Sequence, residues 1–325
     1  MGNLAAVVVG NGFVKTYREG TSVIYPSIIG EDRGGLDFEG LSNSKDRVID
    51  FEGKRYAIGE TAWRLSTVQQ TQMDRSRIGK PFYRTLFASA LAATFAQSGE
   101  VSIVITLPVA WYRKRDQVRD QLAGIYKIGA GKKQLTFDLP PENLRIVPEG
   151  FGVLAAQLLD AEGCVKRSNL SKSMVGIVEV GTGTTDFSLF NNLELVPVKS
   201  DGIDKGLRLV WDAVGGDIEQ AYGRRLEPHE IDRAILKGAF KDSGAVRDVT
   251  AFTKNRMPML STAIQSWIDG TWDSGRVADV IFFGGGGAPQ VKSYFHYSQQ
   301  EFVDDGYIQD ALGSFRFGLF KSRRG

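Results

Sequence analysis

The chain alternates between short apolar runs and longer segments with helical periodicity. The apolar runs predict strands, because they are rich in β-branched residues and end at glycine, proline or asparagine. The predicted strands are Leu4–Val9, Val23–Ile29 (an edge strand broken by Pro26), Arg47–Ile58 (a hairpin around Gly53), Val101–Leu107, Met174–Val180, a hairpin of Asp186–Phe190 with Leu193–Val198, and Val277–Phe283. The predicted helices are Pro81–Gln97, Tyr112–Tyr126, Gly150–Leu159, Gly206–Tyr222, Pro228–Leu236 and Met257–Ile268. This alternation predicts an α/β protein with mixed sheets.

Three glycine clusters directly follow predicted strands. Glycine allows positive φ and a close approach of the backbone to a ligand, and successive amides in such turns form an anion-binding nest. The sequence contains no Walker loop, because the pattern Gly-x-x-x-x-Gly-Lys-[Ser/Thr] is absent. It contains no Rossmann pattern either, because these loops lead from strand into strand and not into a helix. The clusters are Gly10-Asn11-Gly12, Gly181-Thr182-Gly183-Thr184-Thr185 and Gly284-Gly285-Gly286-Gly287. They predict a site that binds phosphate through glycine hairpins, with Lys15 available to neutralise charge.

The first two clusters also repeat one design, an apolar strand, then Gly-x-Gly, then a second strand. VVVGNGFVK begins at Val7, and VEVGTGTTDFSLF begins at Val178. Two related halves would produce this echo, and so would two ordinary hairpin turns, so both interpretations stay open on the residues alone.

Composition narrows the class of protein. The chain has 325 residues, 42% apolar residues and a formal net charge of +2, which is typical of a globular protein and does not favour a broad nucleic-acid-binding face. One cysteine, Cys164, excludes an internal disulfide and fits a reducing cytoplasm. One Cys and two His argue against a zinc site. No apolar run is long enough for a membrane span, and the N-terminus lacks the features of a signal peptide.

Taken in order, the motifs resemble the actin, sugar-kinase and heat-shock chaperone superfamily. They are most similar to the bacterial and archaeal actin-like proteins that include the ParM-type plasmid-segregation ATPases. The matching segments are Val8–Lys15 (first phosphate motif), Leu107-Pro108 (start of the first connecting segment), Pro148–Ala156 (hinge helix), Glu179–Asp186 (second phosphate motif), Val280–Ala288 (adenosine motif) and Ala311–Gly318 (last connecting segment). Each motif alone is weak evidence, but together the motifs follow the order of the family over nearly the whole chain.

The resemblance implies a two-lobed actin-like fold, a duplicated ribonuclease H-like architecture with a nucleotide cleft between the lobes. Domain I is then expected at 1–164, with 305–325 returning to it and 33–98 as its outer subdomain. Domain II is expected at 165–304, with about 215–255 as its outer subdomain. The implied cofactors are ATP or ADP, or GTP, with Mg²⁺. The implied ligand-binding residues are the three glycine clusters and Lys15, with Glu230 and Arg233 near the base or ribose.

The sequence departs from the family at the acidic residues. The first-motif aspartate is replaced by Val8, and the second-motif aspartate by Glu179. In relatives these acids hold the hydrated Mg²⁺, and a carboxylate can do so through water, whereas valine cannot. Three accounts remain open: slow hydrolysis with Glu179 alone, nucleotide binding with little hydrolysis, or a degenerate site. The intact glycine and threonine framework favours the first two.

Several candidates also have structural interpretations. The resemblance makes Glu149 the residue that would position the attacking water, but a glutamate near a helix start is also stabilised by the helix dipole. Lys15 could be a solvated strand-end lysine, Asp186 a turn residue, and Glu230 and Arg233 part of a solvated helix face.

The leading functional hypothesis is an actin-like protein that binds ATP or GTP, polymerises and turns over its filament by slow Mg²⁺-dependent hydrolysis. Plasmid or other DNA segregation is the role of the most similar family members, where a DNA-binding adaptor makes the contact with DNA. The expected partners are therefore the chain itself and such an adaptor, with no direct nucleic-acid contact, in the cytoplasm. The alternatives are a non-hydrolysing nucleotide-dependent scaffold and, with less support, a small-molecule kinase of the same fold.

Overall fold

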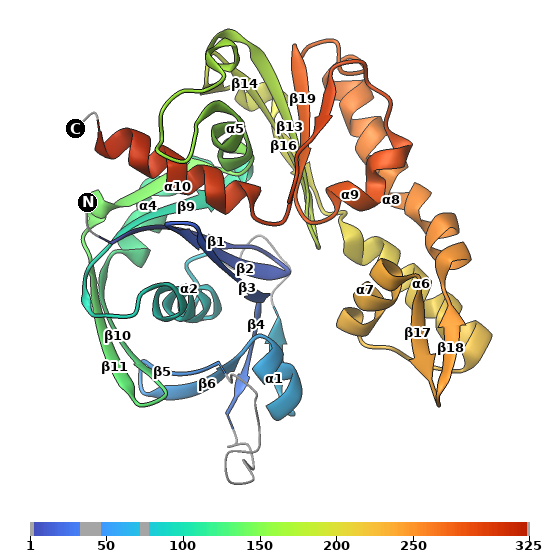
Figure 1. The fold of residues 1–325 in the computed structure, drawn as a ribbon, viewed down its shortest axis with the longest axis horizontal. Coiled ribbons are helices and arrows are strands. Elements are labelled where there is room, and N and C mark those ends of the chain that lie inside the picture. The colour runs from blue at the N-terminus through green and yellow to red at the C-terminus, as the bar shows by residue number, and fades with distance from the viewer. Residues whose placement is uncertain (1–2, 33–46, 72–77, 324–325) are drawn as a thin grey trace. The chain divides into compact units, whose positions relative to one another are not determined.

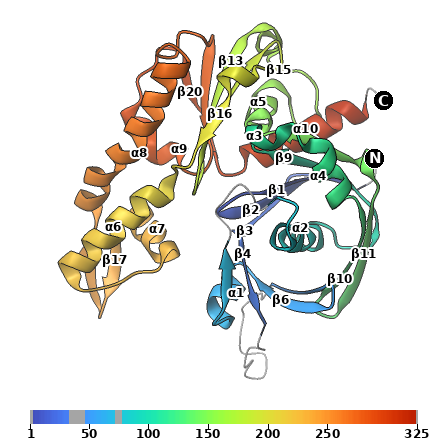
Figure 2. The same ribbon diagram turned by 180° about the vertical axis from the view of Figure 1, so that it is seen from behind.

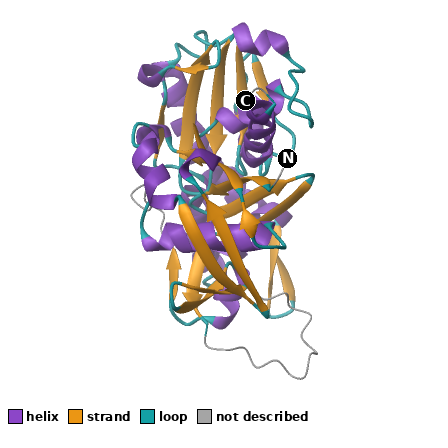
Figure 3. Cartoon of the chain, turned by 90° about the vertical axis from the view of Figure 1, so that its left-hand side faces the viewer, coloured by secondary structure: helices purple, strands orange, loops and turns teal. Residues whose placement is uncertain are grey.

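A computed structural model describes residues 3–32, 47–71 and 78–323 of the chain. The described residues divide into two units, residues 1–171 with 307–325, and residues 172–306. Figure 3 shows helices and strands in both units, in agreement with the α/β class expected from the sequence. The domain bounds taken from the family resemblance stay predictions, and residues 33–46 and 72–77 of the expected outer subdomain lie outside the described residues.

The inner sheet of the first unit has five strands in the order β12-β9-β1-β2-β3. The central strand β1 (Leu4–Val9) pairs in parallel with β9 (Ser102–Leu107), and β9 pairs in parallel with β12 (Leu144–Pro148). On its other side β1 pairs antiparallel with β2 (Phe13–Arg18), and β2 with β3 (Thr21–Pro26). The main sheet of the second unit repeats these directions. Its strand β13 (Met174–Val180) is parallel to β19 (Val280–Gly284), which is parallel to β20 (Gln300–Phe302).

The antiparallel side is repeated as well. In the second unit, β13 pairs antiparallel with β14 (Thr185–Asn191), and β14 with β15 (Glu194–Leu195) and β16 (Asp201–Ile203). The repeated Gly-x-Gly motif therefore lies in equivalent hairpins of two sheets with the same strand directions. This equivalence favours two related halves over two coincidental turns.

A second, seven-stranded sheet covers the other side of helix α2 (Pro81–Thr94) in the first unit. Figures 1 and 2 both show α2 between the two sheets, and its buried side chains, among them Leu86, Phe87 and Leu91, belong to their shared core. The strand order is β7-β4-β6-β5-β10-β11-β8. The bounds are Ile28–Glu31 (β4), Val48–Phe51 (β5), Lys54–Ile58 (β6), Gln69–Thr71 (β7), Gly99–Glu100 (β8), Gly124–Ala130 (β10) and Lys133–Leu139 (β11), with helix α1 at Glu60–Leu65.

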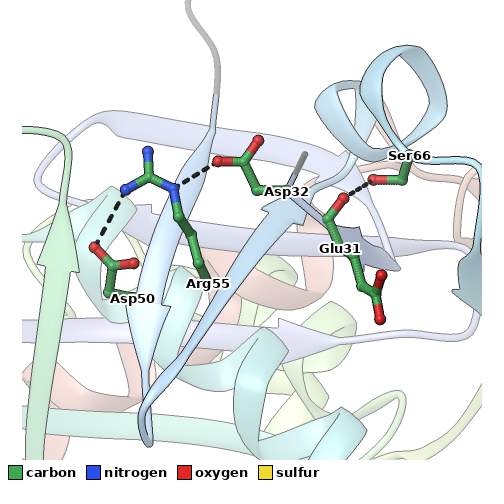
Figure 4. A network of polar contacts seen from close by, with 5 residues as sticks. All are labelled: Glu31, Asp32, Asp50, Arg55 and Ser66. Atoms are coloured by element: carbon green, nitrogen blue, oxygen red, sulfur yellow. Dashed lines mark hydrogen bonds and ion pairs between the residues drawn. The ribbon is translucent and has the colours of Figure 1, made fainter. Parts of the chain in front are cut away.

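A polar network ties β4 to its neighbours at the end of this sheet (Figure 4). The Nε atom of Arg55 lies 2.5 Å from Oδ2 of Asp32, and its Nη1 atom lies 3.7 Å from Oδ2 of Asp50. The hydroxyl of Ser66 donates to the carbonyl of Glu31 at 2.7 Å. The Asp32 side chain is only 5% exposed, so this charge-assisted pair holds the residue directly after β4 against β6.

Helices α5 (Phe151–Leu158) and α10 (Gln309–Ser322) cross closely on the face of the inner sheet opposite α2. The crossing depends on glycine, because a Cβ atom on Gly313 would overlap the carbonyl oxygen of Gly152. Arg316 of α10 donates from Nη1 to the Ala156 and Leu159 carbonyls, each at 2.9 Å, so a cation neutralises the C-terminal end of α5. The remaining helices of this unit are α3 (Val109–Tyr112) and α4 (Arg115–Leu122).

Helices dominate the rest of the second unit. They are α6 (Leu207–Tyr222), α7 (Pro228–Lys237), α8 (Thr250–Thr271) and α9 (Ala288–Val291). The hairpin β17 (Ala239–Asp242) and β18 (Ala245–Asp248) lies beside α7. Trp211, Ile264 and Trp272 are among the buried residues that join these helices to the sheet.

Most predicted elements form, and four need correction. The expected edge strand Val23–Ile29 is two strands, β3 and β4, because the chain passes from the inner sheet to the seven-stranded sheet at Ser27. The expected helix Tyr112–Tyr126 ends at Leu122, because Tyr126 is a fully buried residue of β10. The expected strand Leu193–Val198 is only Glu194–Leu195, because Pro197 begins a 3-10 turn. Helix α8 begins at Thr250, not at Met257, and passes through Pro258. The β10–β11 hairpin, β12 and α10 have no counterpart among the elements predicted from periodicity.

Candidate functional site

The first glycine loop joins β1 to β2. The Gly10 amide donates to the Phe13 carbonyl at 2.9 Å and closes the turn, and Ser27 donates from Oγ to the Gly10 carbonyl at 2.7 Å. Within the part of the chain that the structure describes, the Gly12 amide donates to no main-chain carbonyl. Lys15 follows on β2, directly opposite Val8. The loop therefore offers a main-chain donor and a nearby cation, which suits an anion.

The second glycine loop closes in the same way. The Gly181 amide donates to the Thr184 carbonyl at 2.9 Å, and the Gly181 and Thr182 carbonyls accept from the Leu207 and Arg208 amides at the start of α6. A Cβ atom on Gly206 would come within 2.6 Å of both accepting carbonyls, so this close approach requires glycine. The Gly183 amide has no main-chain acceptor among the described residues.

The two threonines that end this loop make internal hydrogen bonds. Thr185 is fully buried and donates from Oγ1 to the Lys205 carbonyl at 2.8 Å, ahead of α6. Thr184 donates from Oγ1 to Oδ2 of Asp186 at 2.9 Å. Gly183 and Thr182 remain half-buried, and their binding role stays a prediction together with that of the whole loop.

The third glycine cluster ends β19 and packs against β13. Gly285 has φ of +81°, and a Cβ atom there would overlap the Val180 carbonyl. Gly287 donates its amide to the same carbonyl at 2.9 Å. Gly284 and Gly287 are buried, and Gly286 is half-buried. Close packing of the loop on the strand thus explains two of these glycines, whereas the predicted binding role of Gly286 stays a prediction.

Two carboxylates lie side by side in the second unit. Glu179 of β13 pairs in register with Asp186 of β14, and directly opposed residues of an antiparallel pair project to the same face. Asp186 is a buried residue of β14 with 7% exposure, so the alternative interpretation of Asp186 as a turn residue is wrong. Glu179 also pairs with Gly284 across the parallel ladder, which places the acid between the second and third glycine clusters.

Val8 lies in an apolar cluster in the first unit. Its side chain is 5% exposed and clusters with Ala6, Ile308, Ala311 and Phe315, so helix α10 covers it. The valine that is predicted to replace the family aspartate therefore has apolar neighbours on α10, and Lys15 lies opposite it across the strand pair.

Glu149 lies between β12 and α5. Its amide donates to the Leu107 carbonyl at 2.7 Å, and the next residue, Gly150, is the left-handed N-cap of α5 with φ of 83°. No acidic residue lies in the first turn of α5, so Glu149 precedes the helix end. Its catalytic role stays a prediction.

Helix α7 carries the two residues predicted near the base or ribose. Oε2 of Glu230 accepts the Glu227 amide at 2.9 Å in a capping box, so this carboxylate has a structural role at the start of the helix. Arg233 is exposed. Asp232 was not selected from the sequence, because no motif singles it out; it is half-buried on the same helix. Burial raises the pKa of Asp232 to about 6, and Arg233 only partly opposes this shift.

We expect Asp232→Asn to stabilise the second unit near neutral pH. The pKa is about 6 in the folded state against the ordinary 3.8, so protonation of the carboxyl favours folding. That contribution is complete below about pH 4 and is lost as the pH rises through about 6. Because partial exposure to solvent weakens the effect, Asp232→Asn should raise the free energy of unfolding at pH 7.5 by about 1–2 kcal/mol. Urea unfolding followed by tryptophan emission measures it.

The matched control is Asp212→Asn at an exposed position of α6, which should change the unfolding free energy by less than about 0.5 kcal/mol at either pH. An Asp232→Asn gain of equal size at pH 4 and pH 7.5 would contradict the burial argument.

The described residues contain no group of three or more His, Cys, Asp or Glu side chains arranged to hold a metal ion. The pair Glu179 and Asp186 instead suits a hydrated Mg²⁺ held indirectly, since magnesium keeps several of its waters. Within the same part of the chain, no helix is long and apolar enough to cross a membrane.

Comparisons with known proteins agree with this architecture. Residues 6–152 match the family model "Actin like proteins N terminal domain", and residues 177–296 match "Archaeal actin homologue MreB-like, C-terminal". No relative is found among curated protein sequences. A 15-stranded ParM filament from Clostridium botulinum is 21% identical, with a TM-score of 0.81, 98% of this chain covered and 99% of that one.

Two further solved structures share the fold. Ta0583, an archaeal actin homologue in complex with ADP, is 16% identical with a TM-score of 0.80, and the match covers 99% of this chain and 100% of that one. Bacillus thuringiensis ParM with AMPPNP is 16% identical with a TM-score of 0.69, and the match covers 98% of this chain and 99% of that one.

Proposed function

Because this chain belongs to the actin-like superfamily, we propose that it binds an adenine nucleotide with Mg²⁺ and assembles into filaments in a nucleotide-dependent way. The observation that carries the proposal is the repeated hairpin. Gly10 and Gly181 close their loops with the same main-chain bond, and each loop leaves a glycine amide without a main-chain acceptor among the described residues. Such donors bind phosphate oxygens.

The similar structures support both parts of the proposal. An archaeal actin homologue has been solved with ADP and a ParM protein with AMPPNP. Two other similar structures are filaments, a 15-stranded ParM filament and an Alp12 filament. GTP is the alternative nucleotide.

In this proposal the residues have distinct tasks. The Gly12 and Gly183 amides and Lys15 bind phosphate oxygens, and Gly286 lies against the nucleoside. Glu179, with Asp186 beside it, orients waters of the magnesium shell. Glu149 orients the water that attacks. When bound, Mg²⁺ would neutralise charge on the phosphates.

Hydrolysis is proposed to be slow. The apolar cluster around Val8 supplies no carboxylate to the metal, and most catalysis of phosphoryl transfer comes from positioning and electrostatics. Slow turnover suits a filament that persists and is then disassembled, as in DNA segregation through an adaptor protein. The competing function, a nucleotide-dependent scaffold that does not hydrolyse, is favoured by the same observation.

The test is sedimentation with ATP, GTP, AMPPNP or ADP in the presence of Mg²⁺, followed by electron microscopy, with phosphate release measured on the same samples. We expect filaments with a nucleoside triphosphate and phosphate release below about 1 per minute. Gly183→Val should abolish nucleotide binding, because the side chain would block approach of a phosphate to the loop.

The control for Gly183→Val is Gly216→Val on the exposed face of α6, where added side-chain atoms meet nothing within 4 Å at the Cβ position. Monomers under every nucleotide condition would overturn the filament proposal. Filaments with bound nucleotide and no phosphate release would favour the scaffold.

A further inference from the structure

A groove on the first unit is lined by basic and apolar residues, and none of the predicted nucleotide-binding residues lines it. It has a volume of about 640 Å³ and lies where α3 and α4, the start of β12 and the second half of α10 meet. Figure 2 shows α3 and α4 alongside α10. We propose that this groove binds a short acidic segment of a partner protein, in extended conformation, with one large apolar side chain between acidic residues.

Charge is the first observation that carries this inference. The lining includes four basic side chains, Arg115, Arg119, Arg145 and Lys321, and a single acidic one, Glu142. The Nη1 atom of Arg119 lies 2.5 Å from Oδ1 of Asp116, and this ion pair partly neutralises the charge of Arg119. Arg145 and Lys321 are exposed and form no ion pair with any described residue. These two cations are therefore available to a carboxylate.

The remaining lining is apolar, which selects against a purely ionic ligand. Leu144 and Ile146 are buried at the floor, and Phe317 lies half-buried on α10. Lys321 lies 5.7 Å from the ring of Phe317, and Arg115 lies 5.1 Å from the ring of Tyr112. A large apolar side chain between acidic residues would contact this floor while its neighbours face the cations.

The edge of the inner sheet adds a main-chain anchor. β12 is an edge strand, and the bond from the Glu149 amide to the Leu107 carbonyl sets which of its residues face β9. By the alternation of a parallel ladder, the amide and carbonyl of Ile146 point away from β9. Arg119 donates from Nε to the neighbouring Leu144 carbonyl at 3.2 Å. An extended peptide can therefore pair with Ile146, as in strand addition to a sheet edge.

The same observations favour a peptide over nucleic acid. A nucleic acid needs a continuous basic track, but this groove is short and contains Glu142, and the chain carries a formal net charge of only +2. The inference goes beyond the proposed function, because no residue that lines the groove has a task in the proposed nucleotide site.

The test begins with a phage library of random peptides of about twelve residues, selected on the full chain and counter-selected on Arg145→Glu/Lys321→Glu. The selected peptides should share acidic residues around one large apolar residue. A fluorescein-labelled synthetic copy should bind in anisotropy measurements, and the groove variant should weaken it by at least about tenfold, with weaker binding at higher salt.

The matched control is Lys127→Glu/Lys133→Glu, which reverses two exposed lysines on the β10–β11 hairpin and should leave peptide affinity within about twofold. Circular dichroism and nucleotide binding must be unchanged in both variants. The proposal is overturned if no acidic family is selected, if the groove variant binds the peptide equally well, or if an oligothymidylate of about twelve nucleotides displaces it at lower concentration.

Discussion

Gly313→Ala should destabilise the first unit by about 3 kcal/mol or more. The added Cβ atom would overlap the carbonyl oxygen of Gly152 and lie 2.5 Å from the amide nitrogen of Ala156. Both obstacles are main-chain atoms, so the overlap is relieved only by moving α5 away from α10. That movement would also disturb the two hydrogen bonds from Arg316 to the end of α5. Urea unfolding at neutral pH measures the loss.

The matched control is Gly216→Ala in α6, another glycine inside a helix. A Cβ atom on Gly216 meets nothing within 4 Å, so alanine should stabilise its helix by about 0.5–1 kcal/mol through its higher helix propensity. Equal effects of the two substitutions would mean that α5 and α10 are not in close contact, and would contradict the packing at this crossing.

Val8→Asp should raise phosphate release by at least about tenfold, even though it destabilises the protein without nucleotide. The substitution puts a carboxylate opposite Lys15, at the position that the motif resemblance equates with the first-motif aspartate. The rate of phosphate release should rise because an added carboxylate can orient magnesium-bound water. The stability cost, about 1–3 kcal/mol, follows because the acid would be buried against Ile308 and Phe315. Phosphate release at saturating Mg²⁺ and ATP measures the first effect, and thermal unfolding the second.

The matched control, Val8→Asn, distinguishes the effect of a negative charge at position 8 from the effect of a polar side chain. It should cost similar stability and leave the rate unchanged, because an amide carries no charge with which to hold the metal shell. An unchanged rate in Val8→Asp, with nucleotide bound, would mean that the first motif is aligned wrongly with the family or that the missing acid does not limit hydrolysis.

The strands and glycine loops were predictable because their signals are local. Leu4–Val9 and Met174–Val180 are continuous apolar runs ended by glycine, and each forms a strand with those bounds. The Arg47–Ile58 hairpin also forms, since Gly53 supplies the positive φ that its turn needs. By contrast, the Gly124–Ala130 strand was missed because Tyr126 fits the apolar face of a helix as well as a strand. Only the packing of β10 against α2 in the folded protein decides which element forms.

The sequence by itself determined the class of fold, the two glycine hairpins and the absence of an acid at position 8. These properties depend on residue type and on short-range backbone preference. The tertiary structure alone decided how those residues are used. It places Asp186 beside Glu179, gives the Glu230 carboxylate a capping role, covers Val8 with α10 and forms the basic groove from three distant segments. The reason is physical: burial and charge at a position depend on chain segments far away in the sequence.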